Sequence, residues 1–236
     1  ACIVQDKMGA KHAGAMDISA GCSGYIYAVA CASNMVKAGM YDNVLVIGAE
    51  ILSRLVDWQD RSTCILFGDG AGAAVIGQVD EGYGLLASEL GSDGSLGKIL
   101  NIPASGVAEP VTHRAIDSKR IYIHMEGSEV FKAAVRHMGQ TTLSTLEKAG
   151  ITKEDINMFI AHQANDRIIQ SLAKKLSIPS DRMYVNVDRY GNTSAASVGI
   201  ALDEAVRAGL VKHGDYVVLT GFGAGLTWGC DVLRWM

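Results

Sequence analysis

The sequence predicts an α/β protein built as a layered sandwich with mixed sheets. Strand patterns alternate with helix patterns along the chain, which is typical of α/β folds. Segment 23–38 and the start of segment 194–209 are small or apolar on nearly every face, so we expect both helices to be buried on both sides. A weak repeat supports two similar halves, because the order strand, Cys22, helix, NVLVIG returns as strand, Asn192, helix, YVVLTG. Two buried helices between two sheets predict five layers, α-β-α-β-α.

The individual elements follow from short patterns between turn residues. Apolar or β-branched runs predict strands at about 15–19, 44–49, 72–78, 84–88, 156–161, 184–187, 215–221 and 227–233. Helical periodicity predicts helices at about 23–38, 127–149, 165–177 and 194–209. Two of the three prolines lie in segment 92–118 with several glycines and serines, so a long loop is expected there. We expect the two halves of the fold to comprise residues 1–81 and 82–236.

Composition limits the possible classes of protein. With 236 residues, of which 49% are hydrophobic and 19% charged, the chain can bury a large core and is not disordered. No apolar run is long enough to cross a bilayer, and a net charge of −4 argues against a nucleic-acid binder. Five scattered cysteines without a CxxC pair favour a reducing cytoplasm over a disulfide framework.

Three chemically capable residues lie at the edges of predicted elements. Cys22 follows a strand pattern and opens a helix, where the helix dipole and free N–H groups favour the thiolate. Such a cysteine can carry an acyl group as a thioester. The alternative is a small buried hydrophobe, which is the usual role of a free cysteine. Flanking glycines let the backbone turn sharply and expose the sulfur, which favours the nucleophile.

The other two candidates are His162, which ends the strand INMFIA, and Asn192 in YGNTSAAS. Each also has a structural interpretation: a histidine at a strand end is often structural, and Gly191-Asn192 is a strong turn signal. Asn165 would serve as a helix N-cap. The stretch 68–72, GDGAG, precedes a strand rather than a helix, so it fails the test for a dinucleotide-binding loop and predicts tight backbone packing.

The chain resembles the 3-oxoacyl-(acyl-carrier-protein) synthase III family of thiolase-fold condensing enzymes. The similarity runs from end to end, through ACIVQDKMG, GCSGYIYA, RSTCILFGDGAGAA, HMEGSEVFK, AHQANDRII, AKKL, DRYGNTSAASV, ALDEAVRAG and GFGAGLTWG. The pair AHQAN and GNTSAAS is the most specific part. The resemblance implies a thiolase-like sandwich and two further strand–helix units ahead of Ala1, so we expect the N-terminal half to be incomplete here.

The resemblance also implies an activity: the condensation that starts fatty-acid synthesis. Cys22 would take an acyl group from acyl-CoA, and malonyl-acyl carrier protein would then lose carbon dioxide and attack the thioester. His162 and Asn192 would hold the malonyl thioester carbonyl and stabilise the enolate. The N–H of Ala224, where the family more often has glycine, would join that of Cys22 in an oxyanion hole, and Phe222 would shield the cysteine.

Substrate and partner contacts are implied in the same way. Positions that match coenzyme A and pantetheine contacts are Arg61, Gly127, Ser128 and Asn165. Positions that match a landing site for the acidic carrier protein are Lys132, Arg167, Lys174 and Lys175. Ordinary solvated helix faces are the alternative for these charges. The resemblance implies a homodimer and neither a metal nor a redox cofactor; the composition argues against nucleic acid and membrane.

Two other functions remain open from the sequence. One is a related thiolase-fold synthase of the polyketide type, which would share the cysteine, histidine and asparagine but use no carrier protein. The other is a non-catalytic subunit that binds acyl groups or coenzyme A inside a complex. Acylation of Cys22 by acetyl-CoA would separate an enzyme from such a binder.

Overall fold

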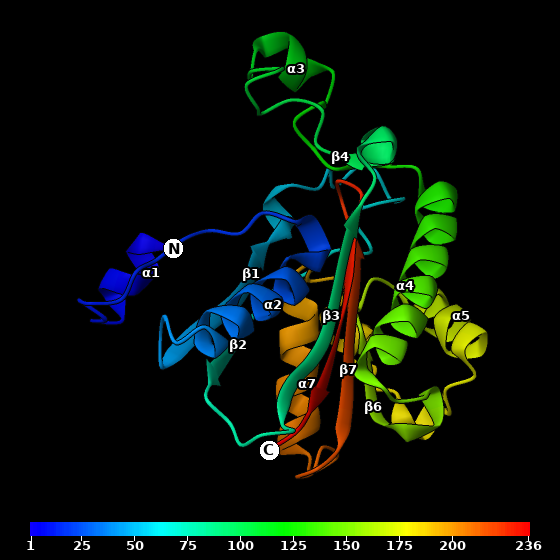
Figure 1. The fold of residues 1–236 in the computed structure, drawn as a ribbon. Coiled ribbons are helices and arrows are strands. Elements are labelled where there is room, and N and C mark those ends of the chain that lie inside the picture. Colours follow the sequence, from blue (N-terminus) through cyan, green and yellow to red (C-terminus); the bar gives the residue numbers. More distant parts are fainter.

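The computed structural model describes all 236 residues. Two sheets enclose a central pair of helices, and a second pair of helices covers the outer face of the larger sheet (Figure 1). This arrangement gives four of the five predicted layers. No helix of the structure covers the outer face of the smaller sheet.

The larger sheet has the order β3-β8-β7-β6. Its strands are β3 (Gly84–Ser92), β6 (Ile156–Ala161), β7 (Tyr216–Gly223) and β8 (Thr227–Arg234). β6 and β7 are parallel, and the other pairs are antiparallel. The mixed sheet expected from the sequence is therefore confirmed.

The smaller sheet pairs β1 (Asn43–Ile51) with β2 (Asp69–Gly77) in antiparallel register. Its inner face packs on the central helices, and glycines make the approach close. A Cβ on Gly72 would lie 2.5 Å from the backbone nitrogen of Ile200, which confirms the tight packing expected of the GDGAG stretch. Its outer face exposes large apolar side chains, among them Ile47 and Val75.

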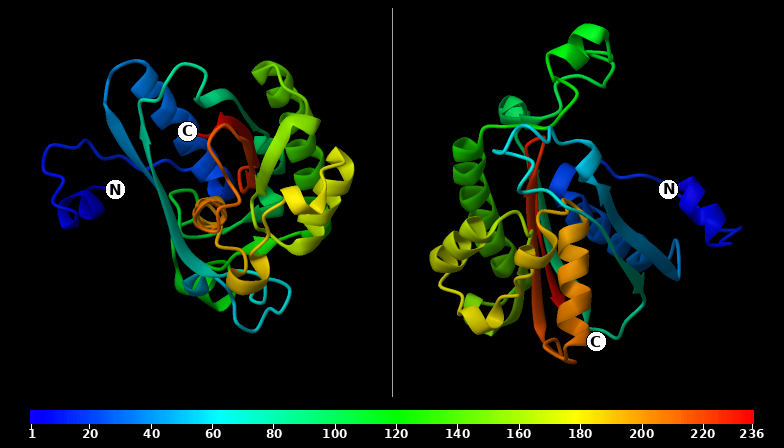
Figure 2. Two further views of the ribbon diagram at one scale, coloured as in Figure 1. Left: turned by 90° about the horizontal axis from the view of Figure 1, so that it is seen from below. Right: turned by 180° about the vertical axis from the view of Figure 1, so that it is seen from behind.

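The central helices are α2 (Gly24–Lys37) and α7 (Ala196–Arg207). Both contact both sheets, as their small and apolar composition predicts, and Figure 2 shows α7 in orange beside the strands of the larger sheet. A core of 14 buried residues forms around them, including Ile26, Val29 and Ala201. Burial of apolar surface on two sides of each helix fixes where their N-termini lie relative to each other.

The covering helices are α4 (Gly127–Ala149) and α5 (Asp166–Leu176). They pack on each other, and α4 packs on β3, β7 and β8. A second core of 17 buried residues fills this layer, including Ile168, Leu172 and Leu176 from the apolar face of α5. α4 ends at Gly150, whose φ of 70° is the left-handed conformation that glycine adopts easily.

Three expectations are wrong. Residues 15–19 form no strand, because no other strand lies alongside to take their hydrogen bonds. Segment 184–187 is not a strand either; only an isolated bridge joins Phe159 to Met183, and helix α6 (Val187–Tyr190) begins there. The predicted loop 92–118 contains the 3₁₀ helix η3 (Gly94–Ile99), strand β4 (Leu100–Asn101) and helix α3 (His113–Asp117).

The remaining elements are short. Helix α1 (Cys2–Lys7) was not expected, and strand β5 (His124–Met125) pairs with β4. Four 3₁₀ turns complete the fold: η1 (Gly21–Ser23), η2 (Leu52–Arg54), η4 (Lys153–Asp155) and η5 (Ser180–Arg182). None of the helices combines the length and the apolar character that a membrane crossing needs.

Candidate active site

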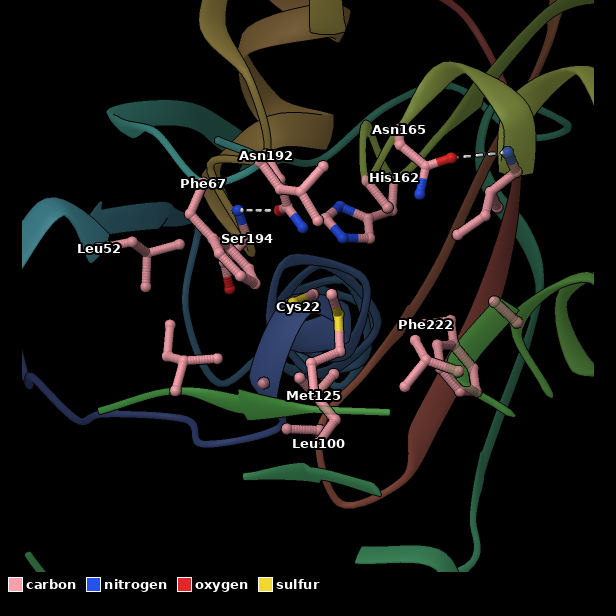
Figure 3. Close-up of a pocket in the computed structure, with 18 of the residues that line it drawn as sticks. Cys22, Leu52, Phe67, Leu100, Met125, His162, Asn165, Asn192, Ser194 and Phe222 are labelled. Carbon is pink, nitrogen blue, oxygen red and sulfur yellow. Dashed lines mark hydrogen bonds between the residues drawn. The ribbon is translucent and has the colours of Figure 1, made fainter. Parts of the chain in front are cut away.

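Cys22, His162 and Asn192 line one cavity of about 180 Å³. They come from three places far apart in the chain, and Figure 3 shows the histidine and asparagine side chains side by side above the sulfur. All three residues are buried. The internal repeat predicted that Cys22 and Asn192 would be neighbours, and the structure places them together for the reason given: each precedes one of the two packed central helices.

Cys22 lies in η1, one turn before α2. The turn depends on Gly21, whose φ is +52° and where a Cβ would lie 2.9 Å from the backbone nitrogen of Ala224. Gly223 is equally constrained, since a Cβ there would lie 2.3 Å from the backbone nitrogen of Cys22. The turn that carries Cys22 and the glycine-rich turn 221–225 therefore touch backbone to backbone. This contact places the N–H of Ala224 beside the Cys22 sulfur.

Burial and hydrogen bonding act in opposite directions on the Cys22 thiol. Burial raises the pKa of its thiol to about 11. The Ser194 hydroxyl and the backbone N–H groups of Ala224 and Cys22 oppose this rise by hydrogen bonding toward the sulfur, whereas the Glu50 carboxylate adds to it. The backbone N–H groups act in the expected direction, but burial outweighs them.

His162 ends β6 and is held firmly on both sides. Its backbone N–H donates to the Thr220 carbonyl at 2.7 Å, and its Nδ1 lies 2.7 Å from Oγ of Ser197. Burial lowers the pKa of the imidazole to about 4, so His162 is neutral at physiological pH. A neutral imidazole can donate one hydrogen bond into the cavity.

Backbone hydrogen bonds to the segment just before β2 hold Asn192 in place. Its N–H donates to the Leu66 carbonyl at 2.8 Å, and its own carbonyl accepts from the N–H of Gly68 at 2.9 Å. Its side-chain Oδ1 accepts from the N–H of Ser194 at 2.8 Å (Figure 3). Because the oxygen is occupied, the amide presents Nδ2 as its free donor. Asn192 is thus both a turn residue and a donor.

The rest of the cavity wall is mainly apolar. Its side chains come from η2, the segment before β2, β4, β5, α4, α5 and β7: Leu52, Phe67, Leu100, Met125, Met138, Ile168 and Phe222. Phe222 is 4% exposed and lies beside Cys22 in Figure 3. Such a wall suits an aliphatic acyl chain and excludes water from the sulfur.

The predicted binding residues lie at different places. Asn165 lines the cavity, but its Oδ1 accepts from the N–H of Ile168 at 3.0 Å, as an N-cap does (Figure 3). Gly127 and Ser128 are exposed at the start of α4, and Arg61 is exposed before β2. Of these four predicted residues only Asn165 reaches the cavity wall.

The predicted carrier-protein residues are all exposed on α4 and α5. Lys132 pairs with Glu129 at 2.8 Å, and Lys175 donates to the Val135 carbonyl at 3.3 Å. These two therefore have local structural partners. Arg167 and Lys174 form no ion pair within 4.0 Å.

Sequence reasoning missed three buried polar residues beside the site: Ser194, Ser197 and Gln163. A signal was present, because serines stand among alanines in a segment that packing alone would make apolar. Gln163 donates to the carbonyls of Ala161 and Tyr184 and accepts from the N–H of Asn186. No group of three or more His, Cys, Asp or Glu residues is arranged to hold a metal ion.

Comparison with known proteins gives the family of this chain. Residues 16–94 match the family described as 3-oxoacyl-[acyl-carrier-protein (ACP)] synthase III, and residues 146–235 match its C-terminal counterpart. The beta-ketoacyl-[acyl-carrier-protein] synthase III of Caldanaerobacter subterraneus subsp. tengcongensis is 56% identical over 235 residues, which cover 100% of this chain and 71% of that protein.

Solved structures show the same fold. The 3-oxoacyl-[acyl-carrier-protein] synthase III of Aquifex aeolicus VF5 is 48% identical with a TM-score of 0.90, over 100% of this chain and 71% of that one. The priming beta-ketosynthase of the R1128 polyketide pathway is 36% identical with a TM-score of 0.88, over 99% and 69% of the two chains. The fold is thus that of the thiolase-like condensing enzymes, and the chain belongs to the 3-oxoacyl-[acyl-carrier-protein] synthase III family.

Proposed function

We propose that Cys22, His162 and Asn192 carry out a decarboxylative Claisen condensation in two half-reactions. The chain is an acyltransferase of the family whose members initiate fatty-acid synthesis. The observation that carries the assignment of residues is that these three side chains line a single apolar cavity.

In the first half-reaction, Cys22 accepts an acyl group from acyl-CoA. The sulfur forms a bond to the acyl carbon, the bond to the coenzyme A sulfur breaks, and the thiol proton ends on the departing coenzyme A. The N–H groups of Cys22 and Ala224 serve as the oxyanion hole, which is supported by the contact between their two turns. Donors of this kind stabilise the developing oxyanion by about 3–4 kcal/mol each.

In the second half-reaction, malonyl-acyl carrier protein enters and its carbon–carboxylate bond breaks. Carbon dioxide leaves, and the electron pair forms an enolate on the thioester oxygen. Nε2–H of His162 and Nδ2–H of Asn192 donate to that oxygen. The enolate carbon then attacks the Cys22 thioester, which gives 3-oxoacyl-acyl carrier protein, and the cysteine sulfur regains a proton from solvent.

Substrate and partner contacts are the finer part of the proposal. Arg61, Gly127, Ser128 and Asn165 bind coenzyme A and the pantetheine arm, and Phe222 shields the thioester. Arg167 and Lys174, with Lys132 and Lys175 beside them, receive the acidic carrier protein; the two without an ion pair are the strongest candidates because their charge is uncompensated. The enzyme acts in the cytoplasm as a homodimer, without metal or redox cofactor, and its halves comprise residues 1–81 and 82–236.

Intact-protein mass after incubation with acetyl-CoA tests the assignment. We expect one added acetyl group, lost in the Cys22→Ala variant and kept in Cys230→Ala, which removes a second buried thiol. His162→Ala and Asn192→Ala should keep the acetyl group but lose condensation with malonyl-acyl carrier protein. An unmodified wild-type protein would instead support a non-catalytic binder, and condensation with malonyl-CoA but not with the carrier-protein thioester would support the polyketide-type rival.

A further inference from the structure

Ser197 lies behind His162, on the side away from the cavity contents. It stands in the first turn of α7 and is 2% exposed. Its Oγ lies 2.7 Å from Nδ1 of His162 and accepts the backbone N–H of Gln163 at 3.2 Å. The hydroxyl therefore has two neighbours, and both belong to the segment that ends β6.

The direction of the contact to His162 follows from counting donors and acceptors. A serine hydroxyl carries one hydrogen and two lone pairs. The Gln163 N–H occupies one lone pair, and no acceptor other than Nδ1 lies within hydrogen-bonding distance of Oγ. A buried hydroxyl that did not donate would leave its hydrogen unsatisfied, which is energetically unfavourable. The Ser197 hydroxyl therefore donates its hydrogen bond to Nδ1 of His162, and Nδ1 accepts it.

We propose that Ser197 is a positioning residue: its hydroxyl donates to Nδ1 of His162 and holds the imidazole as the neutral tautomer whose hydrogen is on Nε2. Nε2 is the ring nitrogen without a protein partner, so the hydrogen is directed at the substrate. The inference rests on the proposed function only for the use of that hydrogen; the tautomer is a property of the free protein.

The segment that carries His162 and Gln163 is held in place by hydrogen bonds. Gln163 is 1% exposed, and all of its side-chain polar atoms are engaged, to the carbonyls of Ala161 and Tyr184 and to the N–H of Asn186. The N–H of His162 is bound to the Thr220 carbonyl. Ser197 is carried by a helix packed between two sheets. The imidazole therefore has one hydroxyl and a fixed backbone to set its orientation.

The surroundings disfavour the imidazolium. Protonation of Nδ1 would turn it from an acceptor into a donor and displace the hydroxyl hydrogen. Burial alone accounts for the lowered pKa of His162, and no charged side chain contributes to it. The titratable group across the cavity is the Cys22 thiol, and the Glu50 carboxylate acts on that thiol rather than on the imidazole.

The direct test is nuclear magnetic resonance of the protein labelled with ¹⁵N in histidine, without substrate. We expect His162 to carry its hydrogen on Nε2 only and not to titrate between pH 5 and 9. In Ser197→Ala, both tautomers should be present, and the imidazole should titrate at higher pH. A hydrogen on Nδ1 in the wild-type protein would overturn the proposal, and this measurement needs no variant to fold.

Kinetics separate positioning from a structural effect. Ser197→Ala should lower kcat of condensation about tenfold, which is the effect of one well-placed hydrogen bond, and leave acylation of Cys22 within twofold. Ser197→Thr, which keeps the hydroxyl, should restore the Nε2–H tautomer. Ser33→Ala removes a buried serine hydroxyl from α2 and serves as the control. Wild-type condensation in Ser197→Ala, or equal losses in both half-reactions, would refute the role. Absence of acylation in the wild-type protein would count against the proposed function and not against the tautomer.

Discussion

Asp231 offers a quantitative test of the energetics of this fold. It lies in the middle of β8, is fully buried, and accepts a hydrogen bond from the Ser88 hydroxyl at 2.6 Å, while its Oδ2 has no partner. Burial raises the pKa of its carboxyl to about 7. An unfolded aspartate has a pKa of about 3.9. The folded protein therefore holds its proton more tightly than the unfolded chain does.

The sign and size of the effect follow from proton linkage. The stabilisation that comes from the protonated carboxyl is complete below pH 4 and is lost as the pH rises through 7. A difference of about three pKa units corresponds to about 4 kcal/mol in total, of which about 3 kcal/mol is lost between pH 5 and pH 8.5. Asp231→Asn removes this dependence while it keeps an oxygen for Ser88.

Urea unfolding at the two pH values measures the prediction. Between pH 5 and pH 8.5 the wild-type protein should lose about 3 kcal/mol of unfolding free energy that Asp231→Asn does not lose. The stability of the variant relative to wild type should therefore rise by that amount. Asp203→Asn, an exposed carboxylate paired with Arg207, is the control and should show no comparable change. If the difference between Asp231→Asn and wild type is the same at both pH values, Asp231 is not a buried neutral acid and the reasoning fails.

Three further predictions concern the site. Gly223→Ala should abolish acylation, because the new methyl group would meet the backbone of Cys22, whereas Gly106→Ala has open space and should not; mass spectrometry after acetyl-CoA decides. Ser194→Ala should slow acylation at pH 7 about tenfold and shift its pH profile upward, because the Cys22 sulfur loses a hydrogen bond that lowers its pKa; an unchanged profile would contradict this. Reversing the charges of Arg167 and Lys174 should raise KM for malonyl-acyl carrier protein more than KM for a small malonyl thioester, and the difference should shrink at high salt. The control variant reverses the charges of Lys7 and Lys11 on the distant N-terminal segment (Figure 1). Equal losses for both substrates would indicate a structural role for Arg167 and Lys174.

The sequence predicted the elements whose patterns are local. The four long helices and the strands of the larger sheet were found because periodicity and turn residues mark them. The composition of segments 23–38 and 194–209 also predicted which helices lie between sheets, since only small side chains allow packing on both sides. Strand 15–19 failed because a strand depends on a partner, and partners are not written in the segment itself.

The site was predicted as a set of residues but not as an electrostatic environment. The internal repeat placed Cys22 beside Asn192, the family resemblance added His162, and the structure shows all three lining one cavity. The sequence could not supply the depth of burial, which raises the pKa of the Cys22 thiol. Nor did it single out Ser194 or Ser197, because their roles depend on atoms that approach from other elements.

Burial acts in opposite directions on the pKa values of the two titratable groups of the site. It raises the pKa of Cys22 to about 11 and lowers that of His162 to about 4. Both shifts favour the neutral forms, thiol and imidazole, over the thiolate–imidazolium pair. A neutral imidazole can donate the hydrogen on Nε2 to the enolate oxygen, as proposed for His162. The desolvation that raises the pKa of the Cys22 thiol therefore also favours the form of His162 that this donation requires.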